Sequence, residues 1–156
     1  KTLLKNKGID FTASFYGDPL LKDESYYKSL KEIVSKSYMT DFISFFNGIP
    51  NEKTVDIYNM HEIFVNLSSS GMYDKTIFEA MACESLILAT NKNLKELIPE
   101  SFIAKEDDAE NIAFKLEKLL SFSNDERERW GREMRRITVE KHSLRELGNK
   151  IAEAIS

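Results

Sequence analysis

Residues 68–90 read SSSGMYDKTIFEAMACESLILAT, and this stretch decides the fold. It follows an apolar run at residues 63–67, which is the length of a buried strand. Serines and a glycine then predict a loop, because they do not continue a strand comfortably. A helical pattern runs from about residues 74–76 to Cys83, and residues 86–90 form another β-favouring apolar run. The order strand, loop, helix and strand is typical of a parallel sheet covered by helices.

The loop and the helix start of this stretch carry candidate binding residues. In open α/β sheets, ligands bind beyond the carboxyl ends of the strands, where backbone N–H groups at a helix start can hold phosphate. Gly71 would let the backbone approach a ligand, and Lys75 could counter the charge of a diphosphate. Glu79 lies about one helical turn further along.

The same alternation of strand and helix patterns extends on both sides. It predicts an α/β fold with a parallel sheet of four or five short strands and helices on both faces. The expected strands cover residues 9–16, 42–46, 63–67 and 86–90, with a brief extended piece at 102–104. A helix is expected at 24–38, and a short one should open at Pro50 and Asn51.

The last third of the chain is helical in pattern and is expected to pack outside the sheet. Three pairs have the spacing of a capping box and predict three helix starts: Asp107 with Glu110, Ser123 with Glu126, and Ser143 with Glu146. Charges of both signs alternate over residues 126–136 and include the helical pair Glu128 and Arg132. This alternation favours a solvated face over an anion-binding site.

Length and composition narrow the class of protein. The 156 residues, 42% of them hydrophobic, fit one domain over residues 1–156. The 22 basic and 26 acidic residues give a formal charge of -4, which does not indicate nucleic acid as a partner. No apolar run is long enough for a membrane helix. One cysteine, Cys83, provides no intrachain disulfide, so a cytoplasmic location is expected.

Two further patterns indicate neither a metal site nor a catalytic nucleophile. His61 and Glu62 begin like a metalloprotease motif, but Val65 stands where the second histidine would be. No metal and no cofactor are therefore expected. Cys83 has no histidine nearby in sequence that would make it a nucleophile.

Several segments together resemble a known family. EAMAC at residues 79–83, followed by the strand at 86–90, resembles the signature of family four retaining glycosyltransferases, which have two facing Rossmann-like domains. YGDP at 16–19, FNGIP at 46–50 and HSL at 142–144 resemble flanking pieces of the same family in the right order. The resemblance covers nearly the whole chain and implies its carboxyl-terminal, donor-binding domain.

The resemblance also implies roles for particular residues. Glu79 matches the glutamate that accepts hydrogen bonds from the ribose hydroxyls of the donor nucleotide, and a carboxylate can accept from both. Gly48 and Ile49 match the turn that lies against the nucleobase. Met72 and Thr76, together with Gly71 and Lys75, complete the residues expected at the nucleotide sugar. None of these residues is expected to be catalytic.

The sequence departs from the family at one important position. The first glutamate of the family's pair, which contacts the donor sugar, falls on Gly71, eight positions before Glu79. GMYDK at residues 71–75 resembles a family variant of this loop, so we interpret the glycine as a feature of a subgroup.

Two alternatives stay open at this stage. Thr76 and Glu79 also have capping-box spacing, so Glu79 could cap its own helix. The chain could also be a non-catalytic Rossmann-like module with a degenerate donor site, acting in interaction or assembly. An unrelated receiver-like domain fits less well, because Asp18 is the one acidic residue in the turn that ends the first strand.

The family's pattern finally implies what accompanies this chain. The partners expected are a UDP- or GDP-sugar and the amino-terminal acceptor domain of the same protein, while peripheral membrane association of the full enzyme is compatible with the resemblance. Family members place a strand and a basic loop before the helix that we expect to end at Gly8, so the first strand of the usual domain should be missing. The chain alone is expected to be inactive.

Overall fold

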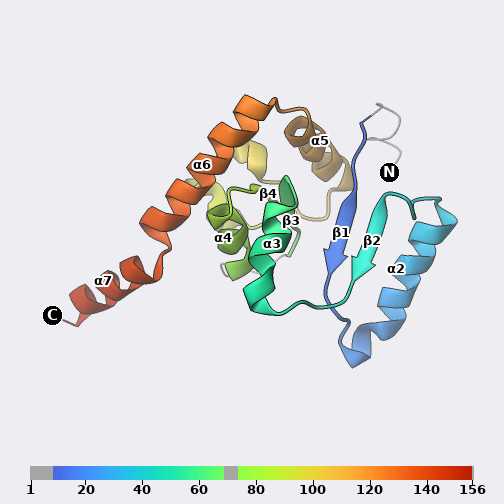
Figure 1. Ribbon diagram of the computed structural model, residues 1–156, viewed down its shortest axis with the longest axis horizontal. Coiled ribbons are helices and arrows are strands. Elements are labelled where there is room, and N and C mark those ends of the chain that lie inside the picture. The colour runs from blue at the N-terminus through green and yellow to red at the C-terminus, as the bar shows by residue number, and fades with distance from the viewer. Residues whose placement is uncertain (1–8, 69–73, 156) are drawn as a thin grey trace. The chain divides into compact units, whose positions relative to one another are not determined.

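The computed structural model describes residues 9–68 and 74–155, which form two compact units. The first unit comprises Lys1–Thr54 and the second Val55–Ser156. Both are built from parallel strands and helices (Figure 1), so the predicted α/β class is confirmed. The prediction that residues 1–156 form a single domain stays a prediction.

The first unit contains one pair of strands and the helix that connects them. Strand β1 pairs in parallel with β2, and Ala13 lies opposite Ile43. Rings stack across the pair, Phe15 on Phe45 with centroids 5.2 Å apart and Tyr16 on Phe46 at 4.8 Å. The elements are β1 (Ala13–Tyr16), η1 (Leu21–Asp23), α2 (Glu24–Lys36), β2 (Ile43–Phe46) and η2 (Asn51–Lys53).

The second unit holds the second strand pair and most of the helices. Strand β3 pairs in parallel with β4, with Ile63 opposite Leu86. The extended piece expected at 102–104 is a single parallel bridge from Ile103 to Ala89. The elements are α3 (Thr54–Asn59), β3 (Ile63–Asn66), α4 (Lys75–Ala82), β4 (Leu86–Ala89), η3 (Lys92–Glu96), η4 (Glu100–Phe102), α5 (Ala109–Leu120), α6 (Asn124–Lys141) and α7 (Leu144–Ala154).

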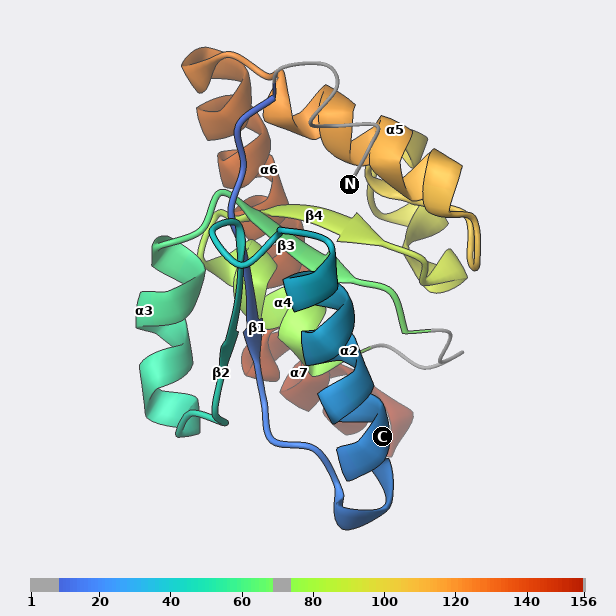
Figure 2. The same ribbon diagram turned by 90° about the vertical axis from the view of Figure 1, so that its right-hand side faces the viewer.

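The hydrophobic core of the second unit surrounds β4. All four residues of this strand are buried, which is why it is apolar throughout instead of alternating. Figures 1 and 2 show α4 on one side of the β3–β4 pair and α5 on the other. Phe102 is fully buried and packs edge-on against Trp130, with ring centroids 5.0 Å apart.

The predicted sheet of four or five strands is wrong for the part of the chain that the structure describes. Those strands form two separate two-stranded sheets, β1–β2 and β3–β4. A sheet is continuous only where neighbouring strands share hydrogen bonds, and no described strand pairs with both β1 and β3.

Two of the three predicted helix starts are confirmed. Ser123 and Glu126 form a reciprocal capping box at α6, and the Ser143 hydroxyl accepts from the Glu146 amide at α7. The prediction for Asp107 is wrong, because Asp107 has a φ of 55° and α5 is capped one residue later. There Asp108 accepts from the backbone N–H of Asn111 at 2.8 Å.

No helix within residues 9–68 and 74–155 combines the length and the apolar character that crossing a membrane requires.

Candidate functional site

A polar network lies at the carboxyl end of β3 and the start of α4. Asp74 is the N-cap of α4, and its Oδ1 accepts from the backbone N–H of Thr76 at 3.0 Å and from the Thr76 hydroxyl at 2.7 Å. Its other oxygen accepts from the Asn66 side-chain amide at 2.8 Å. The Asn66 Oδ1 in turn accepts from the backbone N–H of Ser68 at 3.1 Å. Asn66 therefore ties the end of β3 to the cap of α4.

Hydrogen bonding keeps the Asp74 carboxylate charged. Partial burial acts to raise its pKa, but the hydrogen bonds from Thr76 and Asn66 and the nearby charge of Lys75 outweigh that effect. The pKa of Asp74 is therefore lower than its ordinary value. An anion bound at the start of α4 would therefore lie near a negative charge at the same helix end.

Glu79 lies on α4, and its carboxylate is held by another helix. The hydroxyl of Tyr58, on α3, donates to Glu79 Oε2 at 3.2 Å. The alternative in which Glu79 and Thr76 form a capping box is wrong, because the N-cap is Asp74 and Thr76 already lies inside the helix. Glu79 is half-buried. The Glu79 carboxylate therefore does not cap its own helix and can contact residues of other elements.

Tyr58 remains a hydrogen-bond donor well above neutral pH. Burial raises the pKa of its hydroxyl, and the negative charge of Glu79 and the hydrogen bond to it raise the pKa further. Burial also raises the pKa of Cys83, at the end of α4, with a smaller opposing effect from Arg135. A raised pKa disfavours the thiolate, which agrees with a packing role for this cysteine.

The first unit contains a second contact between strand ends. Asp18, after β1, accepts through Oδ2 from the backbone N–H of Gly48, after β2, at 3.0 Å. A Cβ added to Gly48 would lie 2.8 Å from that oxygen. Glycine at position 48 therefore allows the Asp18 carboxylate to approach the turn that contains Ile49, which is half-buried.

The structure places the remaining candidates as follows. Lys75 is exposed and is the first residue of α4, while the hydroxyl of Thr76 is bonded to Asp74. Gly71 and Met72 lie outside the described residues.

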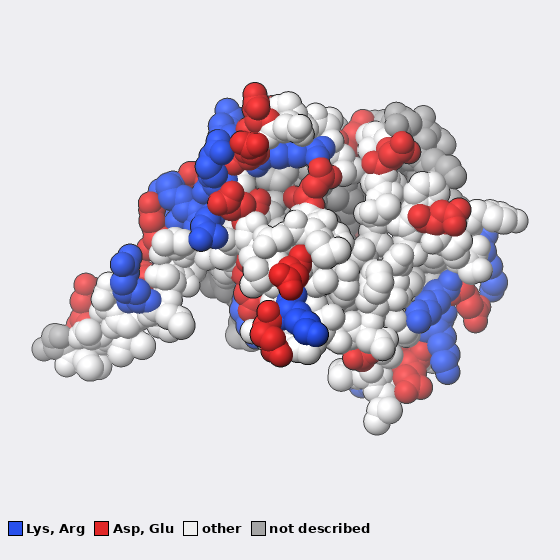
Figure 3. All heavy atoms as spheres, viewed as in Figure 1, with Lys and Arg blue, Asp and Glu red and all other residues white. Residues whose placement is uncertain are grey.

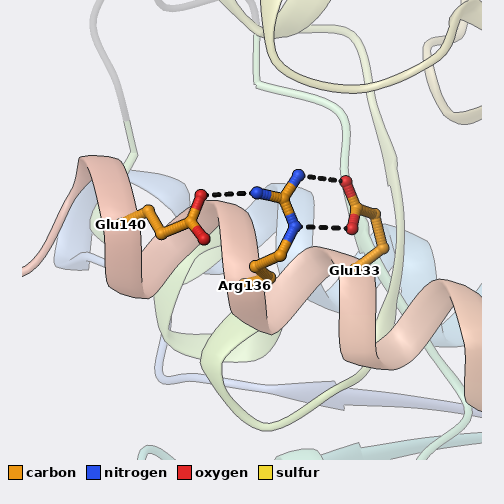
Figure 4. Close-up of polar contacts among 3 residues, drawn as sticks. All are labelled: Glu133, Arg136 and Glu140. Carbon is orange, nitrogen blue, oxygen red and sulfur yellow. Dashed lines mark hydrogen bonds and ion pairs between the residues drawn. The ribbon is translucent and has the colours of Figure 1, made fainter.

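The charged face of α6 contains arginines that pair with carboxylates of the same helix. Arg136 makes two hydrogen bonds to Glu133, at 2.6 and 2.8 Å, and also contacts Glu140 (Figure 4). Arg132 pairs with Glu128 at 3.3 Å, as the spacing predicts. Figure 3 shows basic and acidic side chains intermingled along this helix. The arginines Arg132 and Arg136 thus already have carboxylate partners.

The two histidines contact residues outside the polar network of Asn66, Asp74 and Thr76. His61 Nδ1 lies 2.7 Å from the carbonyl oxygen of Ile57, and the His142 ring stacks on Phe78 with centroids 4.1 Å apart. Burial, then the charges of Lys150 and Lys141, lower the pKa of His142. In the described part of the chain, no three histidine, cysteine or acidic side chains are grouped to hold a metal ion.

Three residues that form these contacts were not predicted from the sequence to have a role in the site. Tyr58 lies 21 residues before Glu79, and that separation has no recognisable spacing. Asn66 could have been found as the one polar residue that ends β3 immediately before the loop. Asp18 stands in the turn after β1, but its partner is the backbone of a residue 30 positions away.

Comparison with known proteins adds independent findings. A family model described as glycosyl transferase-like matches residues 11–153. No curated protein matches the chain. The structure of Alr3699/HepE from Anabaena in complex with UDP is similar at a TM-score of 0.82 and 16% identity, covering 93% of this chain and 40% of that chain.

Two other solved structures have the same fold. Sucrose-phosphate synthase from Thermosynechococcus elongatus gives a TM-score of 0.79 at 15% identity, over 99% of this chain and 47% of that chain. The carboxyl-terminal domain of a glycosyl transferase group 1 family protein from Francisella tularensis gives 0.73 at 16% identity, over 92% of both chains. The chain therefore spans less than half of the first two proteins and nearly all of the third, and its fold is that of a Rossmann-like carboxyl-terminal domain.

Proposed function

The chain belongs to the glycosyl transferase-like family, and from that premise we propose that it is the donor-binding half of a retaining glycosyltransferase. It would bind a nucleotide diphosphate sugar, with UDP or GDP as the nucleotide, and an amino-terminal domain of the same protein would bind a glycan or lipid-linked acceptor. The observation that carries the proposal is the family match over residues 11–153. The likeness in fold to a protein crystallised with UDP supports it.

Glu79 is the residue to which we assign ribose recognition. It is half-buried on α4, the helix that precedes the buried strand β4, and its carboxylate accepts a hydrogen bond from Tyr58. A carboxylate has two oxygens, so the one bonded to Tyr58 leaves the other open to accept from a ribose hydroxyl. Such charge-assisted hydrogen bonds are about twice as strong as neutral ones.

The other proposed contacts rest on the family resemblance and, for Lys75, also on its position at the start of α4. Lys75 would neutralise part of the diphosphate charge, because it is exposed at the start of α4. The Gly48–Ile49 turn, held by Asp18, would lie against the nucleobase. Gly71, Met72 and Thr76 complete the proposed set around the sugar and the diphosphate.

The test replaces Glu79 by glutamine in the complete enzyme. Glu79→Gln should weaken nucleotide binding by about 1.5–3 kcal/mol, the scale of a hydrogen bond to a charged group. The 2′-deoxy nucleotide should bind both forms about equally. Dissociation constants for UDP, GDP and their 2′-deoxy forms would be measured by calorimetry.

Glu128→Gln serves as the control, because it removes an exposed carboxylate on α6. The proposal fails if Glu79→Gln lowers thermal stability and leaves the nucleotide affinity unchanged. In that case Glu79 has only a structural role.

A further inference from the structure

Tyr58 and Glu79 bring together two helices that are separate in sequence. The hydroxyl of Tyr58, near the end of α3, donates to Glu79 Oε2 on α4 at 3.2 Å. Both side chains are half-buried, so the hydrogen bond is only partly accessible to water. A hydrogen bond to a charged group in such a place contributes more than one at an exposed surface.

Tyr58 is itself fixed from three sides. Its ring packs edge-on against Phe64 of β3, with centroids 5.6 Å apart and planes at 83°. Its carbonyl oxygen accepts from the hydroxyl of Ser85 at 3.2 Å. The side chain also packs against the buried core of the second unit. The hydroxyl therefore stands at a defined point relative to β3 and β4.

A fixed donor matters because a glutamate side chain has three rotatable bonds. Ordering such a chain on ligand binding costs about 0.5–1.5 kcal/mol, and a contact that orders it beforehand reduces that cost. The phenol bonds one carboxylate oxygen and stays protonated, since burial and the charge of Glu79 raise its pKa. The carboxylate is then held in one orientation with acceptor capacity remaining.

We propose that Tyr58 is a positioning residue that orients the Glu79 carboxylate toward the ribose hydroxyls of a bound nucleotide. The inference rests on the proposed function, because it assigns to Tyr58 a part in ribose recognition. It predicts that Tyr58 affects selectivity for ribose over deoxyribose without touching the nucleotide.

The experiment is Tyr58→Phe in the full chain, which keeps the ring on Phe64 and removes only the hydroxyl. Calorimetry would give the affinities for UDP and 2′-deoxy-UDP, and for GDP and 2′-deoxy-GDP. The variant should bind the ribonucleotide about 3- to 10-fold more weakly, which is the scale of one net hydrogen bond, and the deoxy form about as well as before. Tyr27→Phe is the matched control, since Tyr27 is a half-buried tyrosine of the first unit.

A double variant separates positioning from general stability. In a Glu79→Gln background, Tyr58→Phe should have no further effect on the ratio of ribose to deoxyribose affinity. An unchanged ratio of ribose to deoxyribose affinity in Tyr58→Phe, including equal losses for both nucleotides, would overturn the inference. The proposed function would still be supported by the effect of Glu79→Gln. If the unaltered chain binds neither pair of nucleotides, both the function and the inference are wrong.

Discussion

The two units differ in how they bury their strands. Among the described residues, Met39 is the one buried hydrophobic residue of the first unit, and every other one belongs to the second. Strand β4 is buried along its whole length, whereas β1 and β2 consist of half-buried and exposed residues. Since burial of apolar surface is the main stabilising contribution, the stability of the chain should reside in the second unit.

The largest expected effect compares two phenylalanines. Phe102→Ala removes a fully buried ring from the core of the second unit and should cost about 3–5 kcal/mol of unfolding free energy. Phe15→Ala in β1 removes a ring that is 54% exposed and should cost roughly 1 kcal/mol. Urea unfolding of both variants measures the difference. Equal losses of unfolding free energy would contradict the expected difference in stability between the two units.

The next comparison uses three glycines. A Cβ at Gly131 would lie 2.5 Å from the backbone oxygen of Glu84, so Gly131→Ala should cost about 1–3 kcal/mol. At Gly48 the obstacle is the movable Asp18 side chain, and the loss should be about 0.5–1.5 kcal/mol, the value of one hydrogen bond.

Gly148 is the control for this series. It lies inside α7 with nothing within 4 Å of an added Cβ, so Gly148→Ala should gain about 0.5–1 kcal/mol of helix stability. Adding Asp18→Ala to Gly48→Ala should relieve any strain between the added Cβ and the Asp18 carboxylate. A loss at Gly48 as large as that at Gly131 would contradict the account, since one obstacle is a side chain and the other is backbone.

The smallest effect concerns two helix caps with the same chemistry. Ser123→Ala removes the cap of α6, which carries the buried residues Met134 and Ile137, and should cost about 1 kcal/mol in global unfolding. Ser143→Ala removes the cap of α7, which has no buried residue, and should lower helicity locally with little effect on global unfolding. Circular dichroism and urea unfolding distinguish the two results.

The α6 cap also predicts a dependence on pH. The backbone N–H of Ser123, and then its hydroxyl, hold the pKa of Glu126 below its ordinary value. Because the folded-state pKa is depressed, this stabilisation is present above the unfolded pKa and is lost as pH falls through the folded one. Ser123→Ala should therefore flatten the acid side of the stability profile in part, because it removes the hydroxyl but keeps the backbone N–H that donates to Glu126. An unchanged profile would show that the Ser123 hydroxyl contributes nothing to this pH dependence.

The sequence allowed the local elements to be predicted well. The expected bounds of β2, β3 and β4 are within one residue of those observed, because each apolar run is followed by polar or turn-forming residues. Helix α5 shows the limit of local patterns. Asp107 and Asp108 are adjacent acids, and the backbone conformation that selects the second as the cap is not encoded in their spacing.

Contacts between distant residues could not be predicted. The division into two strand pairs depends on which strands share hydrogen bonds, and the strand patterns contain no such information. In the candidate site, the ribose-binding role of Glu79 was inferred from the family signature, while its partner Tyr58 comes from another helix. The ligand contacts of Glu79, Lys75 and Gly48 stay predictions.

The central claim is that this chain binds a donor nucleotide through Glu79, and titration with UDP, GDP and ADP observed through backbone amide shifts tests it most directly. We expect one of the three to shift the amides of Gly48 and Glu79 in a saturable way and to leave those of α7 unchanged. Saturating concentrations of all three that leave the Glu79 amide unmoved would contradict the account.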